Sequence, residues 1–379
     1  RFTLLDPSKA TIQSFSFDDT APWPISPDGH GFSLILIDST SNPDPANANH
    51  WRGSGSRHGS PGNADVMTQS EMRINEVLTH TDAPSVDQIE LYNPNVGSVD
   101  VGGWFLTDNR NLPTRYVIPA GTTIAGGGYF TFLEDDDADP LTAPPANYFG
   151  GSFSLSSLGE SVYLLSGDGT NLTGFDEGHQ FVGARNGESF GRWPNASGEF
   201  FPMVSTTLGT ANSGPRFGPL LISEIMYNPP GSGVGTNPDK LEFLEIFNPN
   251  STPVDLTHWK INGLGFDFPA GQTLGAGQVL VILPFDPVVD TADIASFNAA
   301  YHVVISSNPN GFVGPYSGRL DNDGEKLTLL RADDPPADAT VGFSSVIEDQ
   351  ADYENNTPWP DLADGQGKSL NRRGADQWG

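Results

Sequence analysis

The sequence predicts an all-β protein made of repeated units, and three observations support this prediction. Glycine and proline number 44 and 32 among 379 residues, a share that suits short strands joined by tight turns better than long helices. Apolar residues alternate with polar ones in short runs that stop at Asn-Pro, where proline cannot donate to a sheet and holds the preceding residue extended. These runs recur about 150 residues further along the chain, which indicates an internal repeat.

The repeat consists of four pairs of matching segments. Asn93 precedes Trp104 by eleven residues, and Asn248 precedes Trp259 by the same number. The pairs are Arg73–Leu78 with Leu221–Met226, Gln88–Asn95 with Phe243–Asn250, Asp100–Trp104 with Asp255–Trp259, and Ile118–Ile124 with Phe268–Leu274. Because both order and spacing recur, we interpret them as two copies of one folded domain.

These motifs resemble the lamin-tail domains of large secreted bacterial proteins. The resemblance rests on Glu-(Leu/Ile)-(Tyr/Phe)-Asn-Pro, then Val-Asp-(Val/Leu)-x-x-Trp, then Pro-Ala-Gly-x-Thr-(Ile/Leu), in that order and at matching spacing. It covers nearly the whole chain, and it implies tandem immunoglobulin-like β-sandwich domains. The resemblance implies little about activity, because one fold hosts many functions.

The chain divides into one partial unit and two larger ones. Residues 1–65, the half-unit, are predicted to be the C-terminal half of a lamin-tail-like domain. Residues 66–215, the middle unit, form a complete domain, and residues 216–379, the C-terminal unit, lack a closing segment equivalent to Trp51–Gly62. The half-unit is assigned from two matches, Arg1–Leu5 with Lys326–Leu330 and Trp23–Leu34 with Trp359–Leu370.

A half-sandwich exposes an apolar face and open strand edges, so the half-unit is not expected to be stable alone. The apolar residues that need a partner are Leu4, Ile12, Phe15, Phe17, Leu34 and Leu36. The partner is expected to be an upstream half-unit in a longer chain or a neighbouring subunit that lends its strands. We therefore expect the native polypeptide to extend beyond these residues at both ends.

One helix is expected in an otherwise all-β chain. The run Asp290–Tyr301 is expected to form a short amphipathic helix inserted in the C-terminal unit. Asp290 is suited to cap the first turn of a short helix.

Composition excludes several classes of function. The chain carries 18 Lys and Arg against 47 Asp and Glu, a net charge of −29, which disfavours binding to nucleic acid or to anionic membranes. There is no cysteine, so disulfides and thiolate metal sites are impossible. No apolar run approaches the roughly 20 residues that span a bilayer.

The carboxylates Glu76 with Glu90, and Glu224 with Glu245, recur at matching places on strands expected to be neighbours. Paired carboxylates can perform acid–base chemistry or bind calcium. The second glutamate of each pair can also accept backbone N–H groups near the Asn-Pro turn. We favour the structural interpretation, because a catalytic pair would not need to be duplicated in every unit.

Two acidic clusters are candidates for calcium binding, and no other cofactor is expected. They offer hard oxygen ligands but lack the twelve-residue EF-hand spacing, so solvated acidic loops are the alternative. The candidate ligands are Asp135, Asp137, Asp139, Asp321, Asp323 and Glu325. The seven histidines are scattered without an HExxH pattern, which gives no support to a zinc hydrolase.

Tryptophans at repeated positions are expected to pack in the core or at corners. Trp104 and Trp259 lie in the first-half motif, and Trp23, Trp193 and Trp359 lie before proline in the second half. Trp51 and Trp378 have no counterpart in this pattern. If exposed, they could stack on a sugar ring.

The sequence therefore predicts a non-enzymatic structural or adhesive repeat region of a secreted or cell-surface bacterial protein. The partners expected are further copies of the domain, in a longer chain or in neighbouring subunits, and polysaccharide is a further candidate. One alternative is a set of accessory modules that target a large secreted enzyme to a polysaccharide. Another is a subunit of an extracellular filament or surface layer.

Overall fold

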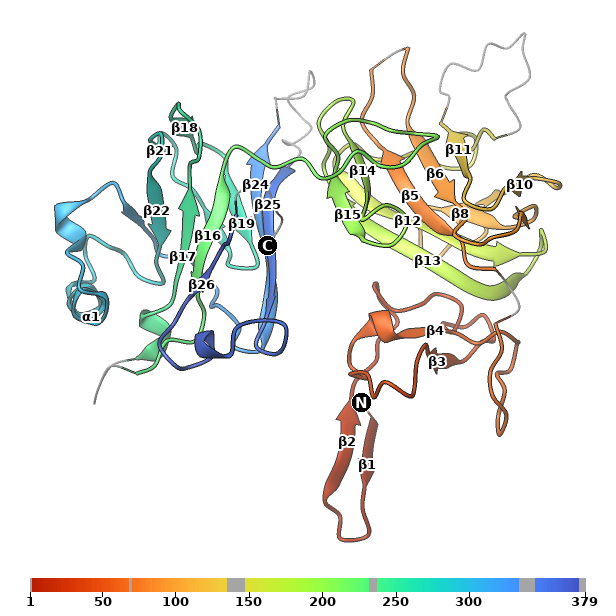
Figure 1. The fold of residues 1–379 in the computed structure, drawn as a ribbon, viewed down its shortest axis with the longest axis horizontal. Helices are drawn as coiled ribbons and strands as arrows, with labels where there is room; N and C mark the ends of the chain where they lie inside the picture. The colour runs from red at the N-terminus through yellow and green to blue at the C-terminus, as the bar shows by residue number, and fades with distance from the viewer. Residues whose placement is uncertain are drawn as a thin grey trace. The chain divides into compact units, whose positions relative to one another are not determined.

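The computed structural model describes residues 2–67, 70–82, 84–134, 147–231, 237–333 and 345–374. The chain forms two compact parts, Arg1–Pro215 and Arg216–Gly379. The first part contains the half-unit and the middle unit, and the second is the C-terminal unit (Figure 1).

The middle unit is a sandwich of two antiparallel sheets. One has the strand order β11-β6-β5-β14-β15 and the other the order β13-β12-β8-β9, with a two-stranded ribbon β10-β7 beside them. The strands are β5 Arg73–Leu78, β6 Gln88–Tyr92, β7 Val99–Asp100, β8 Phe105–Thr107, β9 Tyr116–Val117, β10 Thr123–Ile124, β11 Tyr129–Leu133, β12 Gly159–Gly167, β13 Leu172–Val182, β14 Ser189–Trp193 and β15 Glu199–Pro202. The strands expected from the repeated motifs are confirmed.

The C-terminal unit repeats this topology, with a parallel strand β23 added beside β22 and, among the described residues, no strand beyond β26 at the other edge. Its sheets have the orders β23-β22-β17-β16-β26 and β20-β19-β24-β25, with the ribbon β18-β21. The strands are β16 Leu221–Met226, β17 Phe243–Phe247, β18 Val254–Asp255, β19 Lys260–Asn262, β20 Phe266–Asp267, β21 Thr273–Leu274, β22 Val279–Ile282, β23 Phe312–Val313, β24 Gly324–Ala332, β25 Ser345–Glu354 and β26 Leu370–Asn371. By position in the sheet, β26 corresponds to β14, and the described residues contain no counterpart of β15.

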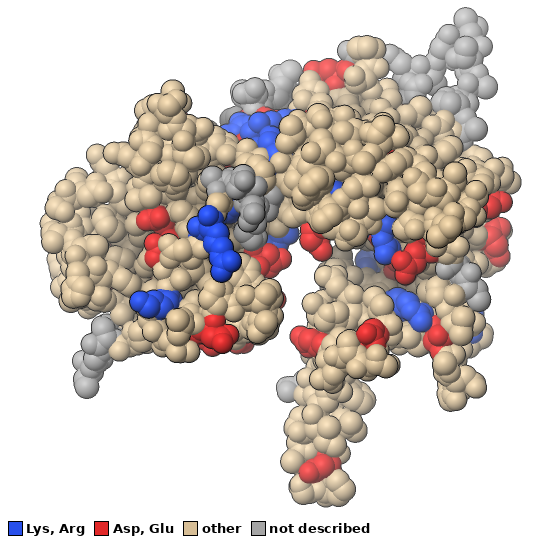
Figure 2. Space-filling view, in the orientation of Figure 1, with Lys and Arg blue, Asp and Glu red and all other residues tan. Residues whose placement is uncertain are grey.

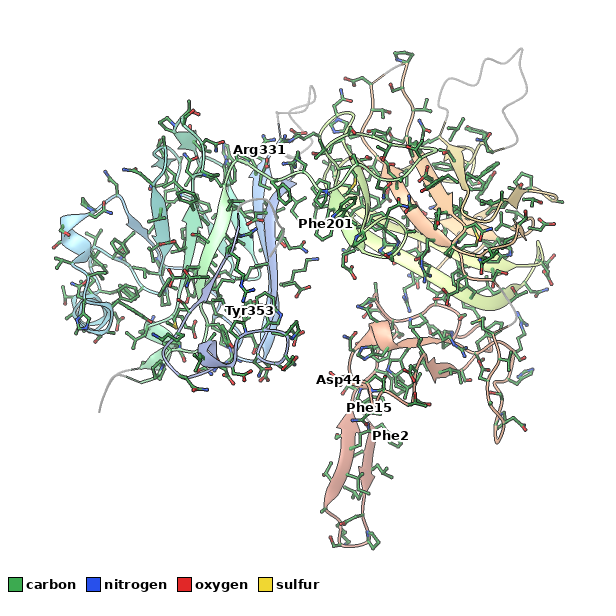
Figure 3. All side chains as sticks on the ribbon, viewed as in Figure 1. Phe2, Phe15, Asp44, Phe201, Arg331 and Tyr353 are labelled. Atoms are coloured by element: carbon green, nitrogen blue, oxygen red, sulfur yellow. The ribbon has the colours of Figure 1, made fainter. Side chains whose placement is uncertain are left out.

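The half-unit contributes two hairpins, β1 Phe2–Leu5 with β2 Thr11–Phe15, and β3 Leu34–Leu36 with β4 Trp51–Gly53. By the sequence matches, β1 corresponds to β24 and β3 to β26, and β2 takes the place of β25 because it pairs with β1 as β25 pairs with β24. Figure 1 shows the β1–β2 hairpin, in red, with no strand beside it. In Figure 3, Phe2 and Phe15 face each other across this hairpin, with ring centroids 5.6 Å apart.

Three of the six apolar side chains expected to lack cover in the half-unit are exposed, and three are not. Leu4, Ile12 and Phe17 are 45%, 62% and 55% exposed, whereas Phe15, Leu34 and Leu36 are half-buried. Phe15 is partly covered because its ring stacks on Trp51 at 5.8 Å.

Each larger unit has its core between its two sheets. In the C-terminal unit this core includes Leu244, Ile246, Trp259, Leu327 and Leu329, all almost fully buried. Trp104 of the middle unit is buried in the same way, as its repeated position predicts. Trp193, expected in the core or at a corner, is the last residue of β14 and is 42% exposed, so it lies outside the core.

Helix α1, Thr291–Tyr301, confirms the expected helical insert, but the amphipathic pattern expected for it is wrong, because its apolar residues are not concentrated on one face. Phe297 is its buried residue, and Ile294, Ala300 and Tyr301 pack beside it against Phe243 and Phe285. Asp290 occupies the N-cap position but makes no capping bond, since its carboxylate accepts the N–H of Asp286 at 2.8 Å. Short 3-10 turns lie at Ala48–His50, Pro238–Lys240, Ile305–Ser307 and Asp361–Ala363.

On the face drawn in Figure 2, Asp and Glu side chains are scattered rather than gathered in one patch. No helix within the described part of the chain is both long enough and apolar enough to span a membrane.

Candidate functional site

The repeated carboxylates of the middle unit lie opposite each other. Glu76 on β5 and Glu90 on β6 are paired in register next to a β-bulge between Ile74 and Glu76, and both are fully buried. Strand alternation alone would put Glu90 on the face opposite Ile89 and Leu91. A closing segment, residues 199–212, covers that second face and buries it.

The chain itself supplies hydrogen-bond donors for these four carboxylate oxygens. Glu76 accepts the hydroxyl of Ser189, and it accepts both the N–H and the hydroxyl of Thr207 at 2.8 Å. Glu90 accepts the Asn75 amide at 2.9 Å and the N–H of Gly209. These bonds favour the structural interpretation, because the acid pair is buried and already bonded.

Burial raises the pKa of Glu90 to about 7, and the charge of Glu76 adds to this effect. The bonds from Asn75 and Gly209 act in the opposite direction but only partly offset the burial. A raised carboxyl pKa is also common at catalytic sites. Here the side chain is not accessible to a substrate, so the raised pKa reflects packing.

The equivalent pair in the C-terminal unit has the same register but less cover. Glu224 on β16 faces Glu245 on β17, again beside a bulge, and both are half-buried. Glu224 accepts the hydroxyl of Ser369, and Glu245 accepts that of Ser223 at 2.7 Å. Burial raises the pKa of Glu245, and the charge of Glu224 raises it further, against the effect of the Ser223 bond.

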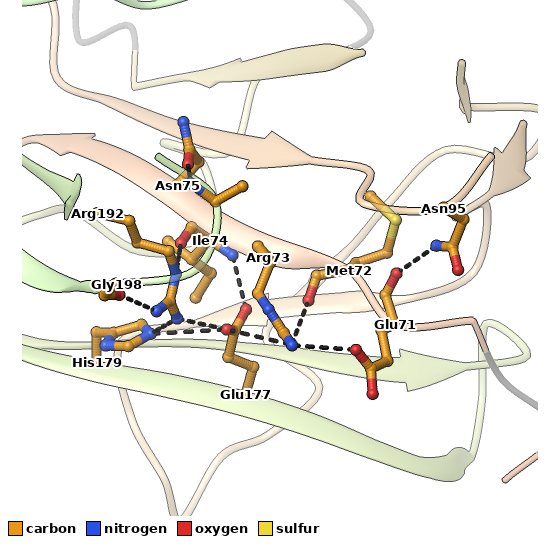
Figure 4. Close-up of polar contacts among 11 residues, drawn as sticks. Glu71, Met72, Arg73, Ile74, Asn75, Asn95, Glu177, His179, Arg192 and Gly198 are labelled. Carbon is orange, nitrogen blue, oxygen red and sulfur yellow. Dashed lines mark hydrogen bonds and ion pairs between the residues drawn. The ribbon is translucent and has the colours of Figure 1, made fainter. Parts of the chain in front are cut away.

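A second repeated group joins the two sheets of each unit, and we call it the arginine clamp. In the middle unit the Glu177 carboxylate on β13 accepts the N–H of Ile74 at 2.7 Å, while Arg192 Nε on β14 donates to the Ile74 carbonyl at 2.9 Å. Arg192 and Glu177 also form an ion pair of 2.5 Å. The two charged side chains therefore hold both polar groups of one β5 residue (Figure 4).

The C-terminal unit has the same clamp with aspartate in place of glutamate. Asp349 accepts the N–H of Ile222 at 2.7 Å, Arg372 Nε donates to the Ile222 carbonyl at 2.7 Å, and the ion pair measures 2.5 Å. Asp349 is almost fully buried. A buried charge without its partner is strongly unfavourable, so each clamp depends on both members.

The two clamp acids differ in their titration. Burial alone would raise the pKa of Glu177, but the bond to His179 and the nearby charges of Arg192 and Arg73 outweigh it and lower the pKa. Burial raises the pKa of Asp349 to about 6 despite Arg372. Glu177 has more basic neighbours, which accounts for the opposite directions.

The half-unit is bound to the middle unit by polar and apolar contacts. Asp176 on β13 accepts the N–H of Ile25 at 3.0 Å and of Ser26 at 2.9 Å, and Arg110 donates to the carbonyls of Trp23 and Pro24. An apolar cluster beside these bonds consists of Ile25, Phe32, Phe105, Tyr163, Leu165 and Leu172. The backbone comes close at Gly174, where a Cβ atom would lie 2.5 Å from the carbonyl of Ser54.

The calcium candidates fall into two groups. Asp135, Asp137 and Asp139 lie outside the described residues. Asp321 and Asp323 lie in the turn before β24, where the N–H of Asp321 donates to Glu325 at 2.9 Å. Within the described ranges, no three His, Asp or Glu side chains come together as metal ligands, and calcium binding stays a prediction.

Trp51, a candidate for sugar stacking, packs within the half-unit. Its ring is half-buried between Phe15 and Trp23, and its indole N–H donates to the Pro45 carbonyl at 3.0 Å. Trp378 lies outside the described residues.

The sequence reasoning missed the arginine clamp. A signal was present, because Gly187–Arg192 and Gly367–Arg372 share the pattern Gly-x-Ser-(Phe/Leu)-x-Arg. The acid partner gave no such signal. Glu177 and Asp349 are different residue types, and the sequences of the strands that contain them do not match. The half-unit has Gln13 and Leu36 at the corresponding places, so it has no clamp.

Two packed sheets in each larger unit, antiparallel apart from the pairing of β23 with β22, define a chain of tandem immunoglobulin-like β-sandwich domains. The lamin tail domain family model matches residues 66–179 and 214–344, which together cover more than half of the chain. The chain therefore belongs to the lamin tail domain family.

Among solved structures, the chain is similar to a DUF4876 family protein from Bacteroides thetaiotaomicron VPI-5482. The identity is 14%, the TM-score is 0.24, and the similarity covers 74% of this chain and 78% of that one. A similarity at this level supports no conclusion about this chain. No curated protein matches it.

Proposed function

We propose that this chain is a non-enzymatic structural or adhesive segment of a secreted or cell-surface protein, and that it assembles through the half-unit. The main observation that supports this proposal is the pairing of the β1–β2 hairpin. Among the described residues β1 pairs with β2 alone, whereas its counterparts β12 and β24 each have a second neighbour, β8 or β19. An unpaired edge with exposed apolar side chains is a ready contact for another strand.

The repeated polar groups support a role without catalysis. The acid pair of the middle unit is buried and bonded to the chain's own donors, and the clamps join the two sheets. Their recurrence in both larger units suits a packing motif. A catalytic centre would need an accessible face.

The partner that fits the half-unit is a strand of another lamin-tail domain, in a neighbouring copy or elsewhere in a longer polypeptide. Main-chain hydrogen bonds along an open edge would supply affinity, and the apolar side chains would add contact area. The secreted or surface location is proposed from the family resemblance.

Light scattering of the full chain at increasing concentration tests this proposal. We expect the mass to rise above 40.4 kDa, and we expect Leu4→Lys combined with Ile12→Lys to abolish the rise, because both side chains are already exposed. Val96→Lys is the matched control, since Val96 is a fully exposed apolar residue far from the hairpin in sequence. A mass of 40.4 kDa at every concentration would contradict assembly, and a rise without a plateau would indicate a filament.

A further inference from the structure

Two adjoining hollows lie where the half-unit meets the middle unit, and together we call them the junction cleft. Their volumes are about 390 and about 550 Å³, within the range of sites for small molecules. Arg57 lies in the wall of both hollows, so they form one site. The walls include His30 and Arg57 of the half-unit, residues 111–115 of the loop between β8 and β9, and Asp168 with residues 170–173 at the turn into β13.

The larger hollow is basic, although the chain as a whole carries a net charge of −29. Arg57 is exposed, and its guanidinium lies over the ring of Phe32, 5.9 Å from the centroid. Arg115 lines the same hollow and is held by an ion pair with Asp108. His30 is a third basic side chain there. This hollow therefore gathers positive charge from both units, which attracts an anionic group.

The smaller hollow differs because it contains a carboxylate. Asp168 lines this hollow, whereas Arg115 and His30 line the larger one. The Asp168 carboxylate accepts the N–H of Asn171 at 2.7 Å and that of Thr170 at 2.9 Å. These bonds, that of Asn171 first, lower the pKa of Asp168, so this carboxylate is ionised at neutral pH. It repels a second anion, while a hydroxyl group finds an acceptor there.

Neutral polar side chains line both hollows. The exposed ones are Asn111, Thr114, Thr170 and Asn171. Amides and hydroxyls both donate and accept hydrogen bonds, as the hydroxyl groups of a sugar do.

Bonds within the chain hold the backbone of the cleft in place. The N–H of Asn111 donates to the side chain of Asn109 at 2.9 Å. Next to Arg57, the N–H of His58 donates to the Gly31 carbonyl at 2.6 Å. A wall that is fixed in advance loses little conformational freedom when a ligand binds.

We propose that the junction cleft binds a polysaccharide at a uronate linked to a neutral sugar. The uronate carboxylate binds Arg57 in the larger hollow, where Arg115 adds to the attraction, and hydroxyl groups of the neutral sugar bind Asn171 and Asp168. A peptide rich in acids fits less well, because its carboxylates recur at every residue and one lies beside Asp168.

This inference goes beyond assembly through the half-unit. The cleft is lined by residues outside the β1–β2 hairpin, and its ligand is of another class. Failure of the cleft to bind sugar would leave assembly through the hairpin untouched.

Fluorescence anisotropy tests the site, with the full chain and a labelled xylose oligosaccharide that bears one glucuronate. We expect saturable binding that weakens at least ~10-fold with Arg57→Met, because a charge-assisted bond is lost while the side chain still covers Phe32. Arg319→Met is the matched control, since Arg319 is an exposed arginine in the other compact part, and it should leave binding unchanged.

Two further ligands test the chemistry of the site. The same oligosaccharide without its glucuronate, and a tetrapeptide of glutamate, should each bind at least ~10-fold more weakly. Equal binding of either one would overturn the proposal. So would the absence of saturable binding by the glucuronate-bearing sugar, or an affinity that Arg57→Met does not change.

Hydrogen exchange locates the sugar without any variant of the chain. We expect new protection at residues 109–115 and 168–173 when the glucuronate-bearing sugar binds. Protection confined to other residues would overturn the proposal.

Discussion

Glu90 lies directly opposite Glu76 in the register of β5 and β6, and two facing carboxylates repel each other when both are ionised. Burial raises the pKa of Glu90 to about 7, and the donors on Asn75 and Gly209 stabilise the charge that remains. The same environment that suits a catalytic acid is therefore produced here by packing and by a closing segment.

This raised pKa predicts the direction in which stability changes with pH. A carboxyl group with a higher pKa in the folded state binds its proton more tightly there, so its stabilising contribution is present below pH 4.5 and is lost as pH rises through about 7. Pulse proteolysis in urea at pH 5 and pH 8 should show the middle unit less stable at pH 8. Glu90→Gln should reduce this difference by up to ~3 kcal/mol, whereas Glu354→Gln, at an exposed glutamate of the C-terminal unit, should leave it unchanged. A difference that Glu90→Gln does not alter would contradict the assignment.

The sequence predicted the paired acids but not their partners, for a physical reason. Glu76 and Glu90 lie in repeated strand motifs, so the repeat alone is enough to predict that they are neighbours. Thr207, which completes the pair, is more than a hundred residues away from both acids, and only folding brings it there. The arginine clamp could not be predicted, because it matters for stability only where its charged side chains are buried. The sequence around Glu177 and Asp349 does not show that these side chains are buried.

At the scale of elements, the half-unit shows how an incomplete sandwich is attached to the neighbouring middle unit. Its Ile25 and Phe32 pack on the sheet formed by β8, β12 and β13, while Asp176 and Arg110 bond to its backbone. The sequence predicted correctly that Leu4 and Ile12 would lack cover. It did not predict the attachment at Asp176, since that contact joins residues 150 positions apart.

Asp176→Ala should release the half-unit without unfolding the middle unit, because the substitution removes the acceptor of two backbone bonds at the junction. Limited proteolysis followed by mass spectrometry should then show faster cleavage within residues 1–65 alone. Asp100→Ala is the control, since Asp100 accepts a backbone bond in an exposed turn elsewhere. Faster cleavage throughout residues 66–215 would show that Asp176 supports the sandwich itself.

For the whole molecule, composition and repeat length predicted the fold class and the tandem domains. They could not predict which strands pair at each sheet edge of the described residues, as the parallel pairing of β23 with β22 illustrates. The net charge of −29 acts on the entire chain, because like charges repel more strongly in the compact state than in the extended one.

This repulsion predicts that salt stabilises the protein. Raising NaCl from about 0.02 M to about 0.5 M shortens the screening length severalfold, so the melting temperature should rise by a few degrees. Differential scanning calorimetry measures this shift. Sucrose at matched osmolality is the control for non-ionic effects, and a melting temperature that falls with salt would contradict the account.

The central claim is that each larger unit is an independent sandwich held by its own arginine clamp. Hydrogen exchange with mass spectrometry on Arg192→Met and Arg372→Met tests it most directly, with Arg319→Met, at an exposed arginine outside both clamps, as the control. Removing one clamp arginine should cost ~3–5 kcal/mol and speed exchange by ~2–4 orders of magnitude, in residues 70–215 for the first variant and in residues 216–374 for the second. Exchange that is unchanged in the variant's own unit, or equally faster in both units, would contradict the claim.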